Sequence, residues 1–172
     1  PELAALVEQA QPLYDEFFHE DFLDELRGWE GATVAFLVDA ASAKAAAADG
    51  SPGNRTLLGF IVYKFWGAPL RTMSILRVAV PHKYRMMGFG KQLVKWSMER
   101  ARQKSRHECT KVTLCAMPEA VAFYDRLQFK PIPEEDLMEL PEEEEGRGER
   151  LPGALWMDWK CGRAYKPSGR QR

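Results

Sequence analysis

The sequence predicts a single α+β domain, built around one mixed, mostly antiparallel sheet that is flanked by helices. A length of 172 residues with 45% hydrophobic content suits one globular core. Two stretches, 1–29 and 88–106, have apolar residues at helical spacing, whereas short β-branched and aromatic runs lie between turn signals elsewhere. This irregular mixture of helices and strands is typical of an α+β domain. We expect the domain to cover residues 1–162 and a basic, flexible tail to cover 163–172.

The N-terminal stretch should form one or two amphipathic helices, broken near Pro12 or His19. A first strand is expected over 32–40, because "ATVAFLVDA" is short, apolar and β-branched. The alanine-rich stretch 40–54 could continue as a helix, but its Gly, Ser and Pro residues favour a surface connection.

The central part of the chain predicts an antiparallel strand pair over 56–66 and 71–80, joined by the turn "GAPL". The helix over 88–106 has one apolar face, made of Leu93, Val94, Ser97, Met98 and Ala101. A strand over 111–117 follows, and Pro118 can begin a short helix because a first helical turn leaves its N–H groups unpaired. The remaining expected elements are a strand opening at 129–133, an acidic loop at 134–150 and a last strand over 154–161.

Composition excludes several classes of function. A net charge of −1 and a pI near 6.4 lack the basic footprint of a nucleic-acid binder. The three cysteines contain no CxxC pair, so we expect neither a structural zinc site nor a disulfide scaffold, and a reducing, intracellular compartment such as the cytoplasm is the simplest interpretation. No run of about 18 apolar residues predicts a membrane span. The sequence starts without Met and shows no signal peptide, which leaves a removed targeting segment open.

The stretch "RMMGFGK", residues 85–91, predicts a turn between a strand and a helix. The first backbone N–H groups of a helix are unpaired and the helix dipole is positive there, so such a turn can bind phosphate. Glycines let the backbone approach an anion closely. The spacing matches neither the dinucleotide fingerprint nor the Walker pattern, since Lys91 precedes Gln92. Taken alone, a turn without a ligand explains these residues equally well.

Two signatures together resemble the GCN5-related N-acetyltransferases. "LRVAV" and "RMMGFG" are similar to the acetyl-CoA-binding motif of this superfamily, and "VTLCAMPEAVAFYDRLQF" is similar to its second signature, which ends Phe-Tyr-x-x-x-Gly-Phe. The resemblance covers roughly 33–129, and more weakly 154–161. One residue departs from the pattern, because Gln128 stands where the family has a helix-ending glycine. A glutamine in the same backbone conformation costs roughly 1 kcal/mol.

The resemblance implies a cosubstrate, acetyl-CoA, and no metal. In the family, pantetheine lies where the fourth strand splays from the fifth. The implied pantetheine contacts are the backbone groups of Val78, Ala79 and Val80, with one amide near Val78 or Ala79 facing the thioester oxygen. The implied pyrophosphate cradle consists of Arg85, Met86, Met87, Gly88, Phe89, Gly90 and Lys91. Tyr124 matches the general acid, and the residues implied along the CoA arm are Pro118, Ala120, Phe123 and Arg126.

The general base does not follow from the resemblance. Family members carry Glu, His or Tyr at the positions of Ser74, Leu76 or Cys115, and this sequence has none of those side chains there. Cys115 is interpreted as a small buried filler, with a reactive thiol as the alternative. We therefore expect proton removal through water or by another carboxylate, either Glu30 or an acid between Glu134 and Glu149.

The resemblance implies transfer of an acetyl group to an amine by direct attack in a ternary complex. An acidic rim at Glu142–Glu145 would favour a cationic amine, either small or on a peptide. Two alternatives stay open: a non-catalytic acyl-CoA-binding module, and a transferase that uses longer acyl groups or protein N-termini. Met73, Met86, Met87 and Met117 could shape a pocket for a longer acyl group. The sequence leaves the acceptor and the oligomeric state undetermined.

Overall fold

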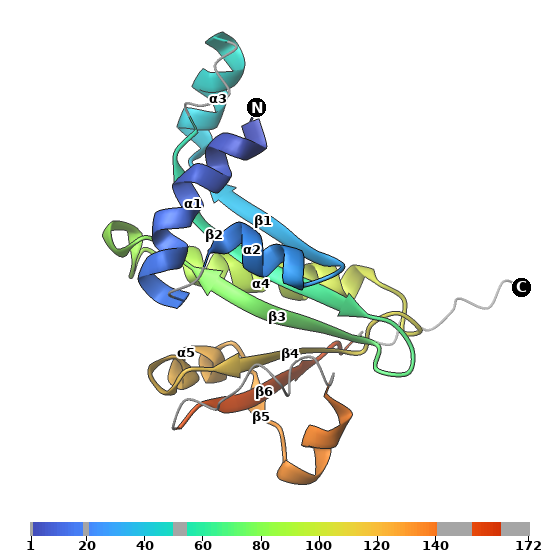
Figure 1. Ribbon diagram of the computed structural model, residues 1–172. Helices are drawn as coiled ribbons and strands as arrows, with labels where there is room; N and C mark the ends of the chain where they lie inside the picture. Colours follow the sequence, from blue (N-terminus) through green and yellow to red (C-terminus); the bar gives the residue numbers. More distant parts are fainter. Residues whose placement is uncertain (1, 19–20, 50–54, 141–152, 163–172) are drawn as a thin grey trace, which may run out of the picture.

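The computed structural model describes residues 2–18, 21–49, 55–140 and 153–162. The described residues form a six-stranded sheet with the strand order β1-β2-β3-β4-β6-β5. Figure 1 shows helices on both faces of this sheet. The expected α+β domain with a mixed sheet is confirmed.

The strands are β1 (Ala32–Val38), β2 (Leu57–Trp66), β3 (Thr72–Ala79), β4 (Lys111–Ala116), β5 (Lys130–Pro131) and β6 (Leu155–Lys160). The longer helices are α1 (Glu2–Phe18), α2 (Phe22–Gly28), α3 (Ala40–Asp49), α4 (Phe89–Gln103) and α5 (Val121–Arg126). Three short 3-10 turns are η2 (His82–Tyr84), η3 (Pro118–Ala120) and η4 (Glu134–Glu139).

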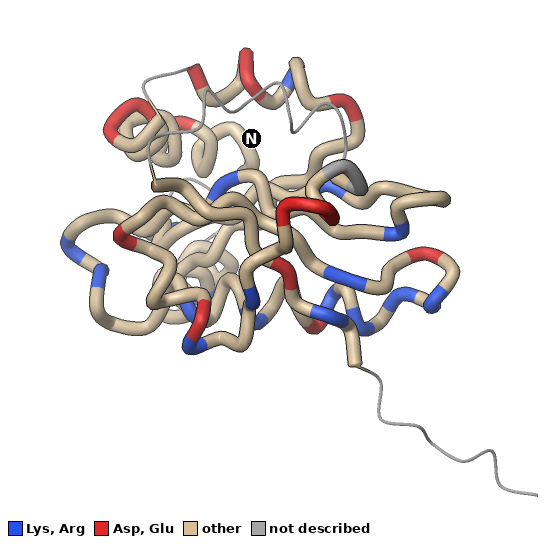
Figure 2. Tube along the Cα trace, turned by 90° about the horizontal axis from the view of Figure 1, so that it is seen from below, with Lys and Arg blue, Asp and Glu red and all other residues tan. Residues whose placement is uncertain are grey.

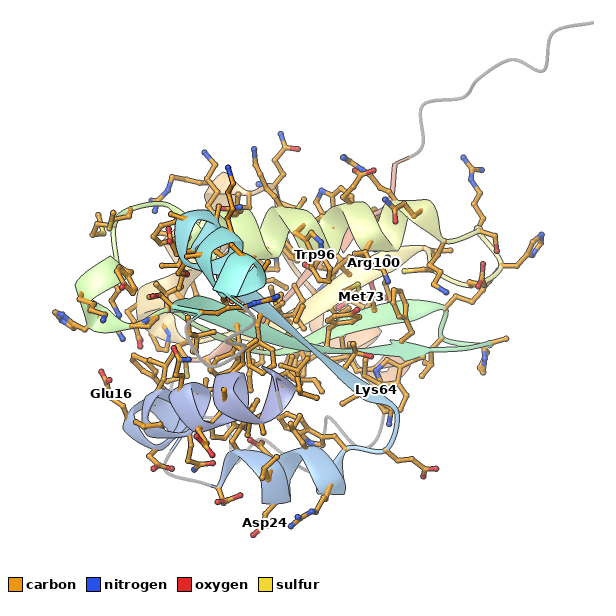
Figure 3. All side chains as sticks on the ribbon, turned by 90° about the horizontal axis from the view of Figure 1, so that it is seen from above. Glu16, Asp24, Lys64, Met73, Trp96 and Arg100 are labelled. Carbon is orange, nitrogen blue, oxygen red and sulfur yellow. The ribbon has the colours of Figure 1, made fainter. Side chains whose placement is uncertain are left out.

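Two hydrophobic cores lie on opposite faces of the sheet, which is seen edge-on in Figure 3. Helices α1 and α2 cover one face with a core centred on Tyr14, Phe22 and Phe60, all fully buried. Helix α4 covers the other face, and it buries the five residues that its sequence pattern predicts. Helix α5 packs against the α4 core through Phe123 and Tyr124. Each amphipathic helix thus buries its apolar stripe against one face of the same sheet.

The observed elements differ from the sequence-based expectations in a few places. Of the two expected positions for a break, Pro12 is wrong, because helix α1 continues through it, and the end of α1 at Phe18 agrees with a break near His19. Asp21 caps α2 by accepting hydrogen bonds from the amides of Leu23 and Asp24, both at 2.9 Å. The alanine-rich stretch forms helix α3, which projects from one end of the sheet in Figure 1, rather than an irregular connection. High alanine propensity therefore prevails until Asp49. The acidic residues 141–149 and the C-terminal tail lie outside the described residues.

The feature that shapes the functional site is a split between β3 and β4. These strands pair in parallel from Thr72 and Lys111 to Ile75 and Leu114. Beyond that last pair, the rest of β3 keeps its pairing with β2 only. In Figure 1 the two strands separate towards their C-terminal ends, where α5 begins. The expected splayed strand pair is confirmed, and we call this opening the split.

A β-bulge accompanies the split. The β2–β3 register passes from Val62 opposite Arg77 to Tyr63 opposite Ile75, so Leu76 is the extra residue. A bulge bends its strand and increases the local twist. The bulge lies directly after the last β3–β4 pair, so it turns the end of β3 away from β4.

No helix in the described part of the chain is long and apolar enough to cross a membrane.

Candidate functional site

The end of β3 supplies one wall of the split. Ala79 is buried on the α1 side, whereas Val78 and Val80 are partly buried against the α4 core. Their backbone pairs with β2 on one edge, through Phe60 opposite Ala79 and Ile61 opposite Val78. The other edge of this segment faces the split. A strand edge of this kind can accept an extended ligand as an additional strand.

The turn from Arg85 to Gly88 connects η2 to the N-terminus of α4. Gly88 adopts a left-handed conformation with φ +87°, and its carbonyl accepts the first helical hydrogen bond from the Gln92 amide at 3.0 Å. The amides of Phe89, Gly90 and Lys91 therefore belong to the first turn, whose N–H groups have no carbonyl within the helix. Unpaired amides at a helix N-terminus are groups that can bind an anion.

Gly90 lies where the three parts of the site meet. A Cβ atom at this position would be 3.9 Å from Val80 Cγ2 and 3.8 Å from Phe123 Cζ. The first turn of α4 is therefore in contact distance of both the end of β3 and helix α5. This contact places the amides of α4 beside the split.

The side chains of the turn point elsewhere. Met86 has φ +63° and is fully exposed, and Met87 is 63% exposed, so neither side chain packs into the protein. The Arg85 guanidinium lies over the Phe17 ring at 4.4 Å, and its Nε is 3.5 Å from the Val80 carbonyl oxygen. In this structure Arg85 therefore faces α1 rather than the N-terminus of α4.

Tyr124 stands on α5, across the split from β3. Its ring packs against Phe123 and Phe129, with centroid distances of 5.0 and 5.8 Å. Burial raises the pKa of Tyr124 to about 12, so the hydroxyl stays protonated at neutral pH. No hydrogen bond within the described part of the chain engages this hydroxyl. Its proton is therefore not committed to another described residue.

A basic groove of about 480 Å³ runs between α4 and the end of α5. Its cationic residues are Lys91, Lys95, Arg102 and Arg126. Glu99 is the one acid in the lining, at 3.7 Å from Arg102. Arg102 also lies over the Trp159 ring at 4.7 Å. The groove starts at the first turn of α4 and continues along the helix, so an anionic ligand could extend from the turn into it.

The sequence from residue 3 to residue 129 matches the acetyltransferase (GNAT) family. The chain belongs to the GNAT family. This membership supports acyl transfer as the class of reaction. No curated protein has a sequence that matches this chain significantly.

Solved GNAT structures share the fold of this chain. Tetrahymena GCN5 superposes with a TM-score of 0.62 at 12% identity, covering 92% of this chain and 88% of that one. NAA60 from Arabidopsis thaliana, solved with a bisubstrate analogue, gives 0.61 at 14% identity over 90% and 91% of the two chains. Ard1 from Thermoplasma volcanium gives 0.58 at 21% identity over 91% and 92%. Identities this low show the fold alone.

Ser74, one of the positions at which GNAT members carry a base, has a structural role in this chain. Ser74 is 1% exposed, and its Oγ accepts a hydrogen bond from Trp66 Nε1 at 2.9 Å. A second hydrogen bond joins it to the Thr113 hydroxyl at 3.1 Å. These bonds connect β2, β3 and β4 where the strands are still paired. Ser74 is therefore engaged in holding the closed end of the split.

Cys115, another of these positions, is exposed, so its interpretation as a buried filler is wrong. The physical reason is the split itself. Leu114 is the last β4 residue with a partner in β3, and Cys115 is the next residue along the strand. Since β3 has turned away at this point, its side chains no longer cover Cys115.

The carboxylates proposed as the general base lie in two different parts of the molecule. Glu30 is exposed and lies just before β1. The first β1 residue, Ala32, pairs with Lys64 of β2, and Lys64 pairs with Ser74 in the part of β3 that is still paired with β4. The 3-10 turn η4 contributes exposed acids, of which Asp136 acts electrostatically on Asp158. Glu30 is thus remote from the split, whereas η4 is close to the outer strands.

Asp158 is a residue that the sequence-based search did not select. It lies on β6 opposite Thr113, which in turn pairs with Ser74, so these three polar residues form a row across the α1-side face. Burial raises the pKa of Asp158, and Asp136 adds to this effect, whereas Lys160 and Lys111 oppose it. An acid in the middle of the apolar strand "ALWMDWKC" was the available signal.

The proposed acyl-pocket methionines do not gather around the split. Met73 is fully buried in the α4 core, Met86 and Met87 are at the exposed tip of the turn, and Met117 is 41% exposed after β4. Their positions give no support to a common acyl pocket. Among the described residues, no group of three or more His, Cys, Asp or Glu is arranged to hold a metal ion.

Proposed function

We propose that this chain transfers an acetyl group from acetyl-CoA to a primary amine by direct attack in a ternary complex. The observation that supports this most strongly is the split. It brings the strand edge at the end of β3, the first turn of α4 and helix α5, which carries Tyr124, to one place. Acetyl transfer from a thioester to an amine needs backbone groups that bind the cosubstrate and a proton donor for the leaving thiolate.

In this proposal the α4 side of the split holds the cosubstrate. Backbone groups of Val78, Ala79 and Val80 pair with the amide groups of pantetheine. The amides of the turn from Arg85 to Lys91 hold the pyrophosphate. The basic groove then takes the phosphorylated ribose end, with Lys95 and Arg126 as the cationic contacts. Pro118, Ala120 and Phe123 line the path on the β4 side.

The chemistry assigns separate tasks to the groups around the split. An amide near Val78 or Ala79 donates a hydrogen bond to the thioester oxygen, which becomes more negative during attack. Tyr124 gives its proton to the sulfur of the leaving CoA thiolate. Water in the split removes the proton from the attacking amine, because the side chains at Ser74 and Cys115 are poor bases.

The acceptor is proposed to enter from the opposite face and to be cationic. Helix α1 has four acidic and no basic residues, whereas α4 has four basic residues and one acid. Glu16 and Asp24 lie on one side of the sheet and Arg100 lies on the other in Figure 3. An anionic cosubstrate and a cationic acceptor would thus approach opposite faces of one sheet.

The test is a mass-spectrometric screen of amines and N-terminal peptides with acetyl-CoA. We expect one class of amine to gain 42 Da, and initial rates with both substrates varied to give intersecting lines, as a ternary complex requires. Parallel lines together with an acetylated Cys115 in the intact protein would contradict direct attack. Propionyl-CoA and longer acyl-CoA, run beside acetyl-CoA, test the alternative of a longer acyl group.

A binding module without catalysis is the second candidate, and the engagement of Ser74 in structural hydrogen bonds favours it. This candidate predicts that CoA raises the melting temperature. It also predicts no product with any amine of the panel. Turnover of a single amine at a rate that depends on Tyr124 would exclude it.

A further inference from the structure

Two of the three cysteines lie together beyond the end of the β4–β6 pair that is opposite to the split. Lys111 and Lys160 form the outermost pair between β4 and β6. One residue further out, the Cys161 amide donates a hydrogen bond to the Thr110 carbonyl at 2.9 Å. Cys109 precedes Thr110, so Cys109 and Cys161 are diagonal neighbours across the two strands.

Both side chains turn to the same face of the sheet. Cys109 is 2% exposed within the α4 core, and Cys161 is partly buried against that core. The Cys161 thiol hydrogen-bonds to the Cys109 sulfur, and the Cys109 thiol donates to the Lys111 carbonyl at 3.4 Å. Both cysteines are thiols in the structure.

We propose that Cys109 and Cys161 form a reversible disulfide when the protein meets a peroxide. The Cys161 side chain is within hydrogen-bonding reach of the Cys109 sulfur, and both cysteines flank the end of the β4–β6 ladder, which holds the two strands in register. A disulfide needs an S–S distance of about 2 Å, which side-chain rotation can supply between neighbouring strands. Cys115 cannot compete, because it is on the opposite face of β4 and pairs with Trp156.

The reaction has two steps. The partly exposed Cys161 sulfur attacks hydrogen peroxide, so that an S–O bond forms, the O–O bond breaks and water leaves. The Cys109 sulfur then attacks Cys161, so that the S–S bond forms and the S–O bond breaks. The departing hydroxide takes the Cys109 proton and becomes a second water. Two thiols and one peroxide thus give one disulfide and two waters.

The second step is favoured by the surroundings of Cys109. In the reduced protein a hydrogen bond from Cys161 lowers the pKa of the Cys109 thiol, and burial opposes this effect. After Cys161 has reacted, hydrogen bonds to the backbone of Lys111 and Met73 and the positive charge of Lys104 still lower the pKa of Cys109. A thiol with a lowered pKa is more often the thiolate that attacks sulfur. The partly exposed cysteine therefore meets the oxidant, and the buried one resolves the product.

The experiment treats the folded 172-residue chain with hydrogen peroxide, quenches the reaction, and alkylates the remaining thiols in urea. We expect the number of alkylated cysteines to fall from three to one per chain, with Cys115 as the one that is labelled. Peptide mass spectrometry should find Cys109 joined to Cys161, and dithiothreitol should restore all three thiols. The oxidised protein should melt about 5 °C or more higher, because the bond closes a long loop in the unfolded chain.

Matched variants make the test specific. Cys115→Ser should keep the cross-link, and Cys161→Ser should abolish it without the folding risk of changing the buried Cys109. A chain oxidised in urea should give a mixture of pairings, because the β4–β6 ladder no longer selects one. Three labelled thiols after peroxide treatment, or Cys161 recovered as sulfinic acid without a cross-link, would overturn the proposal. None of these readouts depends on acetyl transfer.

Discussion

Tyr124 illustrates how burial of one residue prepares a chemical role. A tyrosine with a pKa near 10 would begin to ionise at the alkaline end of the range that many enzymes use, but its burial shifts the value to about 12. The hydroxyl therefore remains a proton donor throughout neutral and mildly alkaline conditions. Its packing between Phe123 and Phe129 fixes the ring direction.

We predict that Tyr124→Phe lowers kcat about 100-fold, because general acid catalysis contributes at least that much. The KM for acetyl-CoA should change little, since the ring stays in place. Between pH 6 and 10 the wild-type rate should show no fall from ionisation of Tyr124. Steady-state kinetics across this pH range check both points, with Tyr84→Phe as the control, and full activity of Tyr124→Phe would refute the acid role.

Asp158 is the described acid that best fits a cationic acceptor. Its carboxylate is half-buried on the α1-side face, and burial raises its pKa. An acid with a raised folded-state pKa is protonated more readily in the folded protein, so its negative charge appears only as the pH rises past that value.

Asp158→Asn should therefore raise the KM for a cationic acceptor several-fold at neutral pH and leave the KM for acetyl-CoA unchanged. For the wild type, the acceptor KM should rise on acidification, and the variant should lose that dependence. Asp15→Asn, an exposed change on α1, is the matched control. Equal acceptor KM values for wild type and Asp158→Asn would remove Asp158 from the acceptor site.

Gln128 shows that a departure from a sequence motif need not change the backbone. It has φ +69°, the left-handed conformation in which the family's glycine usually ends the helix. The Gln128 and Phe129 amides bond to the Asp125 and Tyr124 carbonyls at 2.8 and 3.1 Å. The chain thus keeps the turn and accepts the steric cost of a side chain.

Gln128→Gly should stabilise the protein by about 1 kcal/mol, because it removes that steric cost. Gln103→Gly, which changes the last residue of α4, should instead destabilise it by about 0.5–1 kcal/mol, since glycine loses more entropy in a helix. Urea unfolding measures both free energies. The explanation fails if the two substitutions shift the free energy of unfolding in the same direction.

At the scale of elements, the close approach of β2 to the end of β3 positions one wall of the split. Gly59 makes this approach possible. A Cβ atom there would be 2.7 Å from the Ala79 carbonyl oxygen and 3.2 Å from Val80 Cγ2. Because the nearest atom belongs to the backbone, β3 itself would have to move.

Gly59→Ala should destabilise the fold by about 1–3 kcal/mol, as overpacking does, and should also raise the KM for acetyl-CoA. The second effect follows because the displaced segment includes Val78, Ala79 and Val80. Gly67→Ala is the control, since a Cβ at Gly67 meets no atom within 4 Å. Thermal unfolding and steady-state kinetics test both variants. If Gly59→Ala is destabilised but keeps the KM for acetyl-CoA of the wild type, the end of β3 does not bind the cosubstrate.

At the scale of the whole molecule, charge is divided between the two faces of the sheet. Figure 2 shows a group of acidic positions on the N-terminal helices, and many basic positions on the opposite side, where acidic positions are interspersed among them. The net charge of −1 hides this separation. The basic side includes the groove beside α4, where a highly anionic ligand would be attracted.

The double variant Lys95→Ala with Arg126→Ala should raise the KM for acetyl-CoA about tenfold, with a smaller rise for the dephospho form of the cosubstrate. The difference should shrink at high salt, since screening weakens exposed charge pairs. Arg100→Ala removes a cation from α4 outside the groove lining and should leave KM unchanged. Identical losses with both cosubstrates would place the 3′-phosphate elsewhere.

The sequence predicted the features that depend on residues near one another in the chain. These are the apolar periodicity of helices and strands, the glycine turn and the Phe-Tyr signature. Local pattern alone predicted the buried face of α4 residue by residue. It also predicted the strand-to-helix turn at 85–91 and the family that the chain belongs to. Alanine propensity in 40–49 was underweighted, since the turn residues after it favoured a loop.

What only the tertiary structure decided are the properties that depend on strand register and on neighbours far away in the sequence. Pairing across the sheet determines four such properties. They are the exposure of Cys115, the hydrogen bonds of Ser74 with Trp66 and Thr113, the position of Asp158, and the proximity of Cys109 and Cys161. A bulge at Leu76 decides where that pairing stops. The sequence by itself therefore determined the elements and the class of protein, and the register of β3, β4 and β6 determined which side chains surround the split.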